Sequence, residues 1–388
     1  MSPRSRLLVA LVSTVLIGYV AVGSLLGRVL GDTSYGQLAV FNEVVRLVIE
    51  AYVEPVNLDR AMAGARLGLT EALDGESAYL DAEELRLYQQ PPRESDAEVG
   101  LVLTRRFGLL MVVGSRPGSP AERAGIKTGD LIRTIDGRHT RPLAGPVGQR
   151  LLRGAPGSVT KLTLLRAGSE PIEVSVVRER LAPTPLRGRM LEDGCGYLKI
   201  AEFPPRVVEE VRGEVEALRK GGARSLVLDL RGAAWGAPAE GVKVAEIFVK
   251  GGLVARVSGT KVPEQLLTAD PGRHAWDRPL AVLVDTGTAG AAEIVAAALL
   301  DSGRSPLVGE HTFGRASLQK VVPMPEGGLV LTVAKYSSPK GAAIHGKGIE
   351  PSVTVAAGEE ADEQGADARD RVLEKALDLL KAEAKTAA

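Results

Sequence analysis

The chain has 388 residues, of which 45% are hydrophobic, so it is long enough for two or three compact domains with buried cores. Lys and Arg together number 48, as do Asp and Glu, so the formal net charge is zero and nothing favours nucleic acid as a partner. Cys195 is the only cysteine, which excludes an internal disulfide and a thiolate metal cluster.

The first feature along the chain is an uncharged apolar run from Leu7 to Leu26. At about 1.5 Å rise per residue it would span roughly 30 Å, the thickness of a bilayer core, so we expect a transmembrane anchor within residues 1–30. Two arginines precede the run, which places the N-terminus in the cytoplasm and the body outside it. The alternative is a signal peptide cleaved near Ala21, and either reading exports the body.

Residues 34–92 are expected to form a helical N-terminal region. FNEVVRLVIEAYVEPV and LDRAMAGARLGLTEAL repeat apolar residues every three or four positions, which predicts two short helices separated at Pro55. In the following ALDGESAYLDAEELRLYQQ, a glycine turn is followed by Asp81, a candidate N-cap for a further helix.

From residue 95 to residue 182 the pattern changes to short alternating strands with one helix, which suits a small β-rich domain. In GSPAERAGIKTGDLIRTIDG, Pro120 can open a one-turn helix that Gly125 ends, and a turn then leads into a strand over residues 131–135. This string resembles the PDZ domains of exported bacterial proteases.

A PDZ domain binds the C-terminus of a polypeptide by adding it as a strand, with the carboxylate held by backbone N–H groups of a glycine-containing loop. The loop position here is Val99, Gly100, Leu101, Val102 and Leu103. The resemblance therefore implies protein C-termini or unfolded peptides as partners. The alternative is that these residues are ordinary strand core and that the groove is closed or unused.

An α/β pattern occupies residues 185–355. The runs ARSLVLDL and PLAVLVDT predict strands covered on both faces, and each is followed by a glycine-rich turn and a helical stretch. Such an alternation places functional residues at the strand ends.

The turns of this region resemble, in order and spacing, the core motifs of the tail-specific, or C-terminal-processing, serine proteases of peptidase family S41. DLR is followed by GTAGAAEIVAAALLDSGR, then VGEHTFGRASLQ, then GKGIEP. YVEPV and LDGESAYLDAEE resemble the segment before the family's PDZ domain, where the usual form is LDPHSxYL, so Gly75 and Glu76 are departures. The resemblance implies a multi-domain α+β protein with a PDZ domain and an α/β tail-specific protease core.

Both catalytic positions of that family are changed in this protein. The family's second motif reads GTASASEI, whose first Ser is the nucleophile, and its third reads TFGKGxxQ, with Lys as general base and Gln orienting it. The nucleophile position is Gly290, the base position is Arg315, and only Gln319 is retained. Glycine has no hydroxyl, and arginine keeps its proton in proteins, so no intact catalytic pair remains.

The oxyanion side also departs from the family pattern. DLRxNxGG reads DLRGAAWG, with Ala233 at the Asn position and Trp235 at the first Gly of the pair. A bulky side chain there disfavours close backbone approach to an oxyanion. Gly236 and Ala291 are the remaining oxyanion positions.

Other hydroxyls lie near these motifs, but a rescued nucleophile would need a base within hydrogen-bond reach, and each hydroxyl is more simply a cap or turn residue. They belong to Thr286, Thr288, Ser302, Ser305 and Ser317. The four histidines show no metal-ligand spacing, and nothing indicates a cofactor; they are His139, His274, His311 and His345.

These patterns together predict a pseudoenzyme that binds peptides or protein C-termini and acts as a scaffold or regulator, with an active protease as a candidate partner. We expect it at the bacterial cell envelope, anchored in the inner membrane with its body in the periplasm, or secreted if the N-terminus is cleaved. Arg315 could hold a peptide carboxylate or form a salt bridge that replaces a lost lysine contact. The alternatives are an active serine-type endopeptidase with a non-standard nucleophile and base, and a domain that serves only for oligomerisation.

Residues 356–388 form the tail. AAGEEADEQGADARD is expected to be a charged linker, and RVLEKALDLLKAEAK an amphipathic helix. That helix would dock on its own domain or pair with a second copy of the protein in a homo-oligomer.

Overall fold

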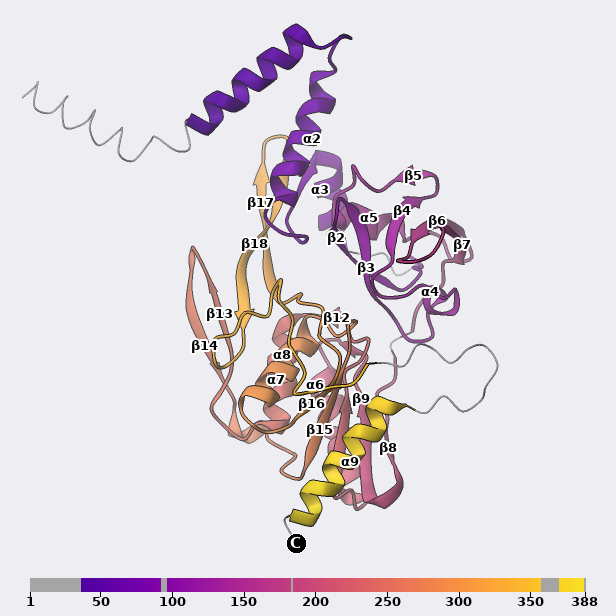
Figure 1. Cartoon of the computed structure of the whole chain (residues 1–388), viewed down its shortest axis with the longest axis vertical. Coiled ribbons are helices and arrows are strands. Elements are labelled where there is room, and N and C mark those ends of the chain that lie inside the picture. Colours follow the sequence, from indigo (N-terminus) through magenta and orange to yellow (C-terminus); the bar gives the residue numbers. More distant parts are fainter. Residues whose placement is uncertain (1–35, 92–95, 183, 357–369, 387–388) are drawn as a thin grey trace, which may run out of the picture. The chain divides into compact units, whose positions relative to one another are not determined.

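The computed structural model describes residues 36–91, 96–182, 184–356 and 370–386 (Figure 1). The protein divides into two units, residues 1–66 and residues 67–388, and each is described by itself. The predicted membrane segment from Leu7 to Leu26 lies outside the described residues. Within the described ranges, no helix is both long and apolar enough to cross a bilayer.

The first unit is helical, as its apolar spacing predicts. Residues 36–51 form one helix, and α2 (Leu58–Glu71) starts in this unit and ends in the second. The side chain of Asn57 caps α2, because its Oδ1 accepts a hydrogen bond from the Arg60 N–H at 2.9 Å. The predicted break near Pro55 is therefore confirmed.

An antiparallel sheet with strand order β2-β3-β4-β6-β7 follows in the second unit, with β5 paired to β4. Pro120 is the first residue of the short helix α4, and Gly125 has a φ of +73° just after it, as predicted for this turn. The core of the sheet is formed by Leu110, Ile132 and Leu162, all at most 1% exposed. The elements are β2 (Leu101–Arg106), β3 (Leu109–Ser115), α4 (Pro120–Arg123), β4 (Leu131–Ile135), β5 (Arg138–His139), α5 (Gly145–Leu151), β6 (Val159–Leu165) and β7 (Ile172–Val177).

The largest core surrounds a six-stranded sheet with order β19-β16-β15-β11-β9-β8, in which only the β8–β9 pair is antiparallel. Its strands are β8 (Gly188–Met190), β9 (Cys195–Lys199), β11 (Ser225–Asp229), β15 (Leu280–Val284), β16 (Leu307–Gly309) and β19 (Val353–Thr354). Alternate residues of a strand point to opposite faces, and every residue of β15 is buried, so both faces of the sheet are covered. ARSLVLDL and PLAVLVDT form β11 and β15, as predicted.

Helices cover both faces of this sheet (Figure 1). On one face lie α6 (Val207–Lys220), α7 (Pro238–Phe248) and α8 (Ala291–Asp301). On the other, α9 (Arg371–Thr386) packs Val372, Ala376 and Leu380 against Val227 and Leu283. The predicted C-terminal helix therefore docks on its own domain.

A second sheet joins segments that are far apart in the sequence, because β1 pairs with β18 although about 250 residues separate them. Asp81, at the end of β1, caps α3: its Oδ1 accepts from the Glu84 N–H at 2.8 Å, which confirms the predicted N-cap. The elements are β1 (Ala78–Asp81), α3 (Ala82–Gln89), β13 (Leu253–Gly259), β14 (Val262–Thr268), β17 (Ser317–Met324) and β18 (Gly327–Ser337). The remaining short elements are the strand pair β10 (Glu202–Phe203) and β12 (Trp235–Gly236) and the 3-10 helices η1 (Glu192–Gly194) and η2 (Pro271–Arg273).

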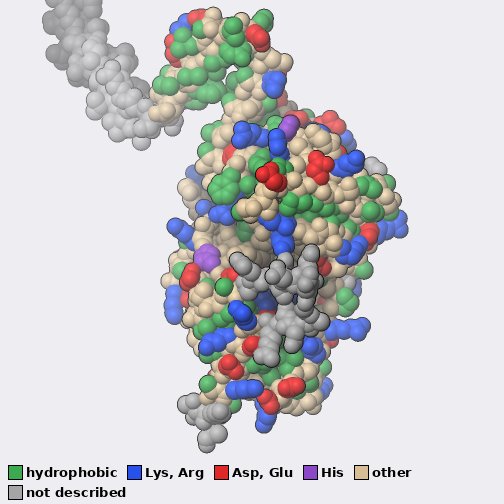
Figure 2. Space-filling model, turned by 45° about the vertical axis from the view of Figure 1, so that its right-hand side comes forward, with side chains coloured by type: hydrophobic (Ala, Val, Ile, Leu, Met, Phe, Trp, Pro, Cys, Tyr) green, Lys and Arg blue, Asp and Glu red, His purple; other side chains and the backbone are tan. Residues whose placement is uncertain are grey.

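The face of the molecule drawn in Figure 2 carries charged side chains of both signs. On the face drawn in Figure 2, Lys and Arg are interspersed with Asp and Glu, in line with the formal net charge of zero. That face gives nucleic acid no continuous basic surface.

The contact of α7 with α8 depends on a glycine and gives the first prediction. A Cβ added at Gly241 would lie 2.2 Å from the carbonyl oxygen of Ala291, the first residue of α8. We expect Gly241→Ala to lower the free energy of unfolding by about 1–3 kcal/mol, measured by urea titration, because α7 must move. Gly213→Ala on α6, where an added Cβ meets nothing within 4 Å, is the matched control. It should leave the fold as stable or more stable by about 0.5–1 kcal/mol; equal losses in both variants would contradict the packing argument.

Candidate functional site

The carboxylate of Glu293, in the first turn of α8, is fully buried and joins two loops. Its Oε2 accepts hydrogen bonds from the N–H groups of Gly290 at 2.9 Å and Arg315 at 2.8 Å. Its Oε1 accepts from the Thr312 hydroxyl at 2.5 Å and the Gly314 N–H at 2.6 Å. Burial raises the pKa of Glu293, while these hydrogen bonds act against the rise. The two motifs that carry the predicted nucleophile and base positions are thus held side by side.

Gly290 has a backbone conformation that L-residues rarely adopt, with φ +64° and ψ −116°. Steric crowding does not exclude a side chain at this position, because an added Cβ would meet only the Arg315 carbonyl oxygen, at 3.5 Å. A serine would fit here but would carry backbone strain. Gly290 supplies no side chain to the site.

The side chain of Arg315 forms a salt bridge, with its Nη2 2.8 Å from Glu76 Oε2. The pair is largely shielded from water, since the two side chains are 30% and 11% exposed. Glu76 also accepts a hydrogen bond at Oε1 from the Thr104 hydroxyl, at 2.7 Å. Of the two possibilities for Arg315, a salt bridge and a bound carboxylate, the structure contains the first.

Gly75 lets the turn that carries Glu76 approach strand β2. An added Cβ at Gly75 would lie 2.3 Å from the carbonyl oxygen of Arg105, so any larger residue would push the turn away. The Arg105 N–H donates to the Gly75 carbonyl oxygen at 3.2 Å. The two departures in LDGES therefore act together: Gly75 permits the contact, and Glu76 pairs with Arg315.

A cavity of about 280 Å³ lies beside this salt bridge. Its ionisable lining residues are Asp74, Glu76, Arg105, Arg106, Arg315, Lys335 and His345. Burial lowers the pKa of His345, so its imidazole is neutral near pH 7. Four cationic side chains against two carboxylates give the lining a basic excess.

Gln319 is the retained family position. Among the hydrogen bonds of the described residues, none joins Gln319 to Arg315. Its Nε2 donates to the Ser317 hydroxyl oxygen at 2.7 Å and lies 3.4 Å from the Thr332 hydroxyl. Ser317 is buried, and its hydroxyl accepts from an amide rather than facing a base. The geometry gives Ser317 a structural role.

The other candidate hydroxyls are hydrogen-bonded or belong to an exposed residue. The Thr288 hydroxyl lies 3.0 Å from both the Leu230 carbonyl oxygen and Asp285 Oδ1, but Thr288 is fully buried and out of reach of a substrate. The hydroxyls of Ser302 and Ser305 donate to backbone carbonyl oxygens, and Thr286 is exposed. Within the described residues, none of them faces a lysine or histidine.

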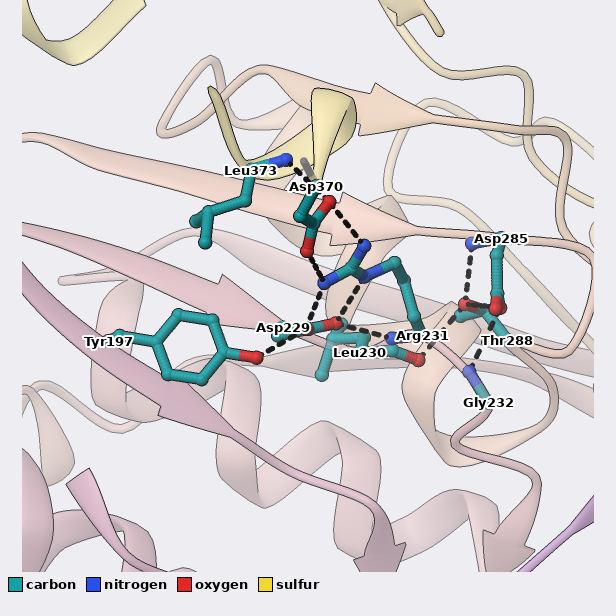
Figure 3. Close-up of polar contacts among 9 residues, drawn as sticks. All are labelled: Tyr197, Asp229, Leu230, Arg231, Gly232, Asp285, Thr288, Asp370 and Leu373. Carbon is teal, nitrogen blue, oxygen red and sulfur yellow. Dashed lines mark hydrogen bonds and ion pairs between the residues drawn. The ribbon is translucent and has the colours of Figure 1, made fainter. Parts of the chain in front are cut away.

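Asp285 holds the two strand-end turns together (Figure 3). Its Oδ1 accepts from the Gly232 N–H at 2.9 Å and the Gly287 N–H at 3.0 Å. Burial raises the pKa of Asp285. Across the same junction, the Ala289 N–H donates to the Ala233 carbonyl oxygen at 2.9 Å. The turn after β11 is thereby fixed against the turn after β15.

The arginine of the DLR motif binds the C-terminal helix rather than the site (Figure 3). Arg231 donates to both oxygens of Asp229, at 3.0 and 2.7 Å, and to both oxygens of Asp370, at 2.9 and 2.8 Å. Asp370 in turn accepts from the Leu373 N–H at 3.0 Å in the first turn of α9. Tyr197 donates to Asp229 at 2.6 Å, and partial burial together with the Asp229 carboxylate raises the pKa of its hydroxyl.

The family's Asn position and the predicted oxyanion positions have different surroundings: an apolar cluster lies beside the first, whereas Gly236 is exposed and Ala291 is buried. Val102 and Val113, from β2 and β3, are buried against Ala234 and Ala289, with Trp235 packed beside them. Gly236 has a φ of +117°, and an added Cβ would lie 2.3 Å from the Phe203 carbonyl oxygen. Gly236 thus serves the β10–β12 pairing, and Ala291 opens α8, whose first N–H groups have no acceptor inside the helix.

The predicted carboxylate loop lies at the start of β2. Val99 precedes the strand, Gly100 has a φ of +82°, and the three residues Leu101, Val102 and Leu103 belong to the strand itself. All five positions are buried. β2 is the first strand of its sheet, so alternate residues of the strand direct their N–H groups to its free edge.

Sequence reasoning missed Glu293, Asp285 and Asp370. Glu293 stands inside the GTAGAAE motif, and that placement was the only signal of its role. The other two carboxylates act through partners that no local pattern reveals.

Comparisons with known proteins agree with this architecture. Residues 194–355 match peptidase family S41, and residues 111–166 match the PDZ domain. The protein is 32% identical over 333 residues to the carboxy-terminal processing protease CtpA of Bacillus subtilis, covering 85% of this sequence and 71% of that protein. It is 30% identical over 333 residues to a carboxy-terminal-processing protease of Bartonella bacilliformis, covering 84% and 76%. The solved structure of a photosystem II D1 C-terminal processing protease superimposes with a TM-score of 0.70 at 28% identity, covering 81% of this protein and 92% of that one.

The Glu293 network gives the second prediction. In Glu293→Gln an amide nitrogen replaces one of two oxygens that each accept two hydrogen bonds, so at least one backbone N–H loses its acceptor. We expect the free energy of unfolding to fall by about 1–3 kcal/mol, measured by urea titration. Glu209→Gln, on the exposed side of α6, is the control and should be neutral. An unchanged free energy of unfolding in Glu293→Gln would disprove that this carboxylate holds the two loops together.

The Arg231–Asp370 pair gives the third prediction. Burial alone would raise the pKa of Asp370, but hydrogen bonds from Arg231 outweigh it and hold the pKa below its usual value of 3.8. The pair therefore stabilises docking of α9 above about pH 3.8 and loses this effect as the pH falls below it. The protection of the Leu373 amide against hydrogen exchange should drop in that window. In Asp370→Asn the protection should be lower at neutral pH and lack this step; an unchanged step would exclude Asp370 as its cause.

Proposed function

The protein belongs to peptidase family S41 and carries a PDZ domain, and from that premise we propose that it binds peptides or protein C-termini without cleaving them. In this proposal it acts as a scaffold or regulator of an active protease or its substrate. The observation that carries the proposal is the Arg315–Glu76 salt bridge, formed by the loop that Glu293 holds beside Gly290. The family has a lysine at the position of Arg315 and a serine at the position of Gly290.

The nucleophile is the first missing requirement. A peptide bond is attacked by an activated hydroxyl, and Gly290 has none. The brace from Glu293 holds Gly290 beside the loop of Arg315, so the site keeps the arrangement of its two loops and lacks the reacting group. The nearby hydroxyls of Thr288 and Ser317 are buried and hydrogen-bonded elsewhere.

The base is the second missing requirement. A general base must be neutral before it takes a proton, and a guanidinium next to a carboxylate stays charged. Glu76 would hold even a lysine at position 315 in its protonated form, because an opposite charge within about 4 Å favours the ammonium. In this proposal three positions inactivate the site, namely Gly290, Arg315 and Glu76. Arg315 and Glu76 contact each other in the salt bridge.

Several parts of the proposal rest on the sequence alone. We propose that Leu7 to Leu26 anchors the protein in the bacterial inner membrane, with residues 95–182 and 185–355 forming the PDZ and protease-like domains outside the cytoplasm. An active protease as partner and a homo-oligomer belong to the same proposal.

The direct test is a cleavage assay with the full-length protein. Purified protein is incubated with an unfolded protein that has an apolar C-terminus, beside an active C-terminal-processing relative as positive control. We expect no loss of substrate and no labelling by a fluorophosphonate, since no activated hydroxyl is present. Cleavage that Ser317→Ala or Thr288→Val abolishes would establish the alternative, an active endopeptidase with another nucleophile.

Rebuilding the site gives the fourth prediction. Gly290→Ser with Arg315→Lys restores the family's two residues but leaves Glu76 to pair with the new lysine. We expect peptidase activity of this double variant to stay at least about tenfold below that of the triple variant that adds Glu76→His, because only the triple variant frees the amine to lose its proton. Equal activity of the two variants would show that Glu76 does not control the base position.

A further inference from the structure

The edge of strand β2 is the place where a PDZ domain would add a peptide strand. β2 is the first strand of its sheet, so every second residue directs its N–H and C=O away from β3. These outward residues are Leu101, Leu103 and Arg105. A bound C-terminus would use the same backbone groups.

Gln149, on the facing helix α5, occupies two of those groups. Its Nε2 donates to the Leu101 carbonyl oxygen at 2.7 Å, and its Oε1 accepts from the Leu103 N–H at 3.1 Å. The carboxamide of a glutamine offers a donor and an acceptor, as a peptide group does, so Gln149 makes hydrogen bonds that a peptide strand would make. It bonds the strand at both ends of the span Leu101–Leu103.

The next outward-facing N–H group, that of Arg105, is also hydrogen-bonded: it donates to the Gly75 carbonyl oxygen at 3.2 Å. Helix α5 also leaves little room between itself and the sheet for a peptide strand. A Cβ added at Gly148, the neighbour of Gln149, would lie 2.1 Å from Leu110 Cδ1, so α5 lies close against the sheet. Leu101 and Leu103 are only 1% and 6% exposed.

We infer that Gln149 is an internal competitor of the peptide: its carboxamide satisfies the β2 edge in the free protein, and a C-terminus binds only when that side chain swings away. The inference rests on the proposed capture of C-termini by this domain. It makes Gln149 a residue that sets affinity without being part of the bound peptide's own contacts.

The test compares peptide affinities of full-length variants. An N-terminally labelled decapeptide ending in two valines, with a free or an amidated C-terminus, is titrated by fluorescence anisotropy. Gln149→Ala and Gln149→Met remove the two hydrogen bonds, and Met keeps the volume. We expect both variants to bind the free-carboxylate peptide about tenfold more tightly than the wild type, since peptide addition no longer breaks these bonds. Arg150→Ala, on the same helix, is the control and should bind as the wild type does.

The outcomes separate the inference from the function beneath it. If the wild type binds the peptide and both Gln149 variants bind it with the affinity of the wild type, the competition is disproved and the capture of C-termini stands. If Met matches the wild type while Ala binds tightly, the side chain acts by bulk alone and the hydrogen-bond argument fails. If no variant binds, or the free and amidated peptides bind equally, the proposed carboxylate capture is disproved.

Hydrogen exchange supplies a readout that needs no peptide. The Leu103 amide should exchange faster in both Gln149 variants than in the wild type, because it loses its acceptor. The Arg105 amide, which donates to Gly75, should be unchanged and serves as the internal control. A Leu103 amide equally protected in all variants would show that the carboxamide does not hold this edge in solution.

Discussion

Glu293 accepts hydrogen bonds from four groups on two loops, and the position of the whole site depends on that constraint. A fully buried carboxylate is tolerated only when its lone pairs are satisfied, so the start of α8 and residues 312–315 must stay together. Because the brace needs only backbone N–H groups and one hydroxyl, it is indifferent to the side chains at Gly290 and Arg315. The arrangement of the two loops therefore does not depend on which side chains stand at these two positions.

The departures from the family pattern contact one another. Arg315 needs a carboxylate once it is shielded from water, and Glu76 supplies it. Glu76 reaches it because Gly75 lets its turn approach β2. Val102 and Val113 pack against Ala234 and Ala289 in the two strand-end turns, so strands β2 and β3 contact the same loops through apolar side chains.

The sequence predicted what local patterns control and left open what distant contacts decide. Periodicity and glycine turns were enough for β11, β15, α8 and the α4 turn, and the motif spacing located Gly290 and Arg315. The partner of Arg315 stayed open between a salt bridge and a ligand, because Glu76 lies 239 positions earlier and no local signal joins them. Asp370 meets Arg231 across 139 positions, and Gln149 reaches a strand almost 50 positions away, so their roles appeared only in three dimensions.

The conformation of Gly290 has a consequence for single substitutions at this site. A serine at a φ of +64° and a ψ of −116° would carry backbone strain of about 1–3 kcal/mol. It would still face the loop of Arg315, whose guanidinium is paired with Glu76. Under the function proposed above, no single substitution therefore supplies both a hydroxyl and a neutral base, and a first substitution toward the family pattern costs stability before any chemistry is gained.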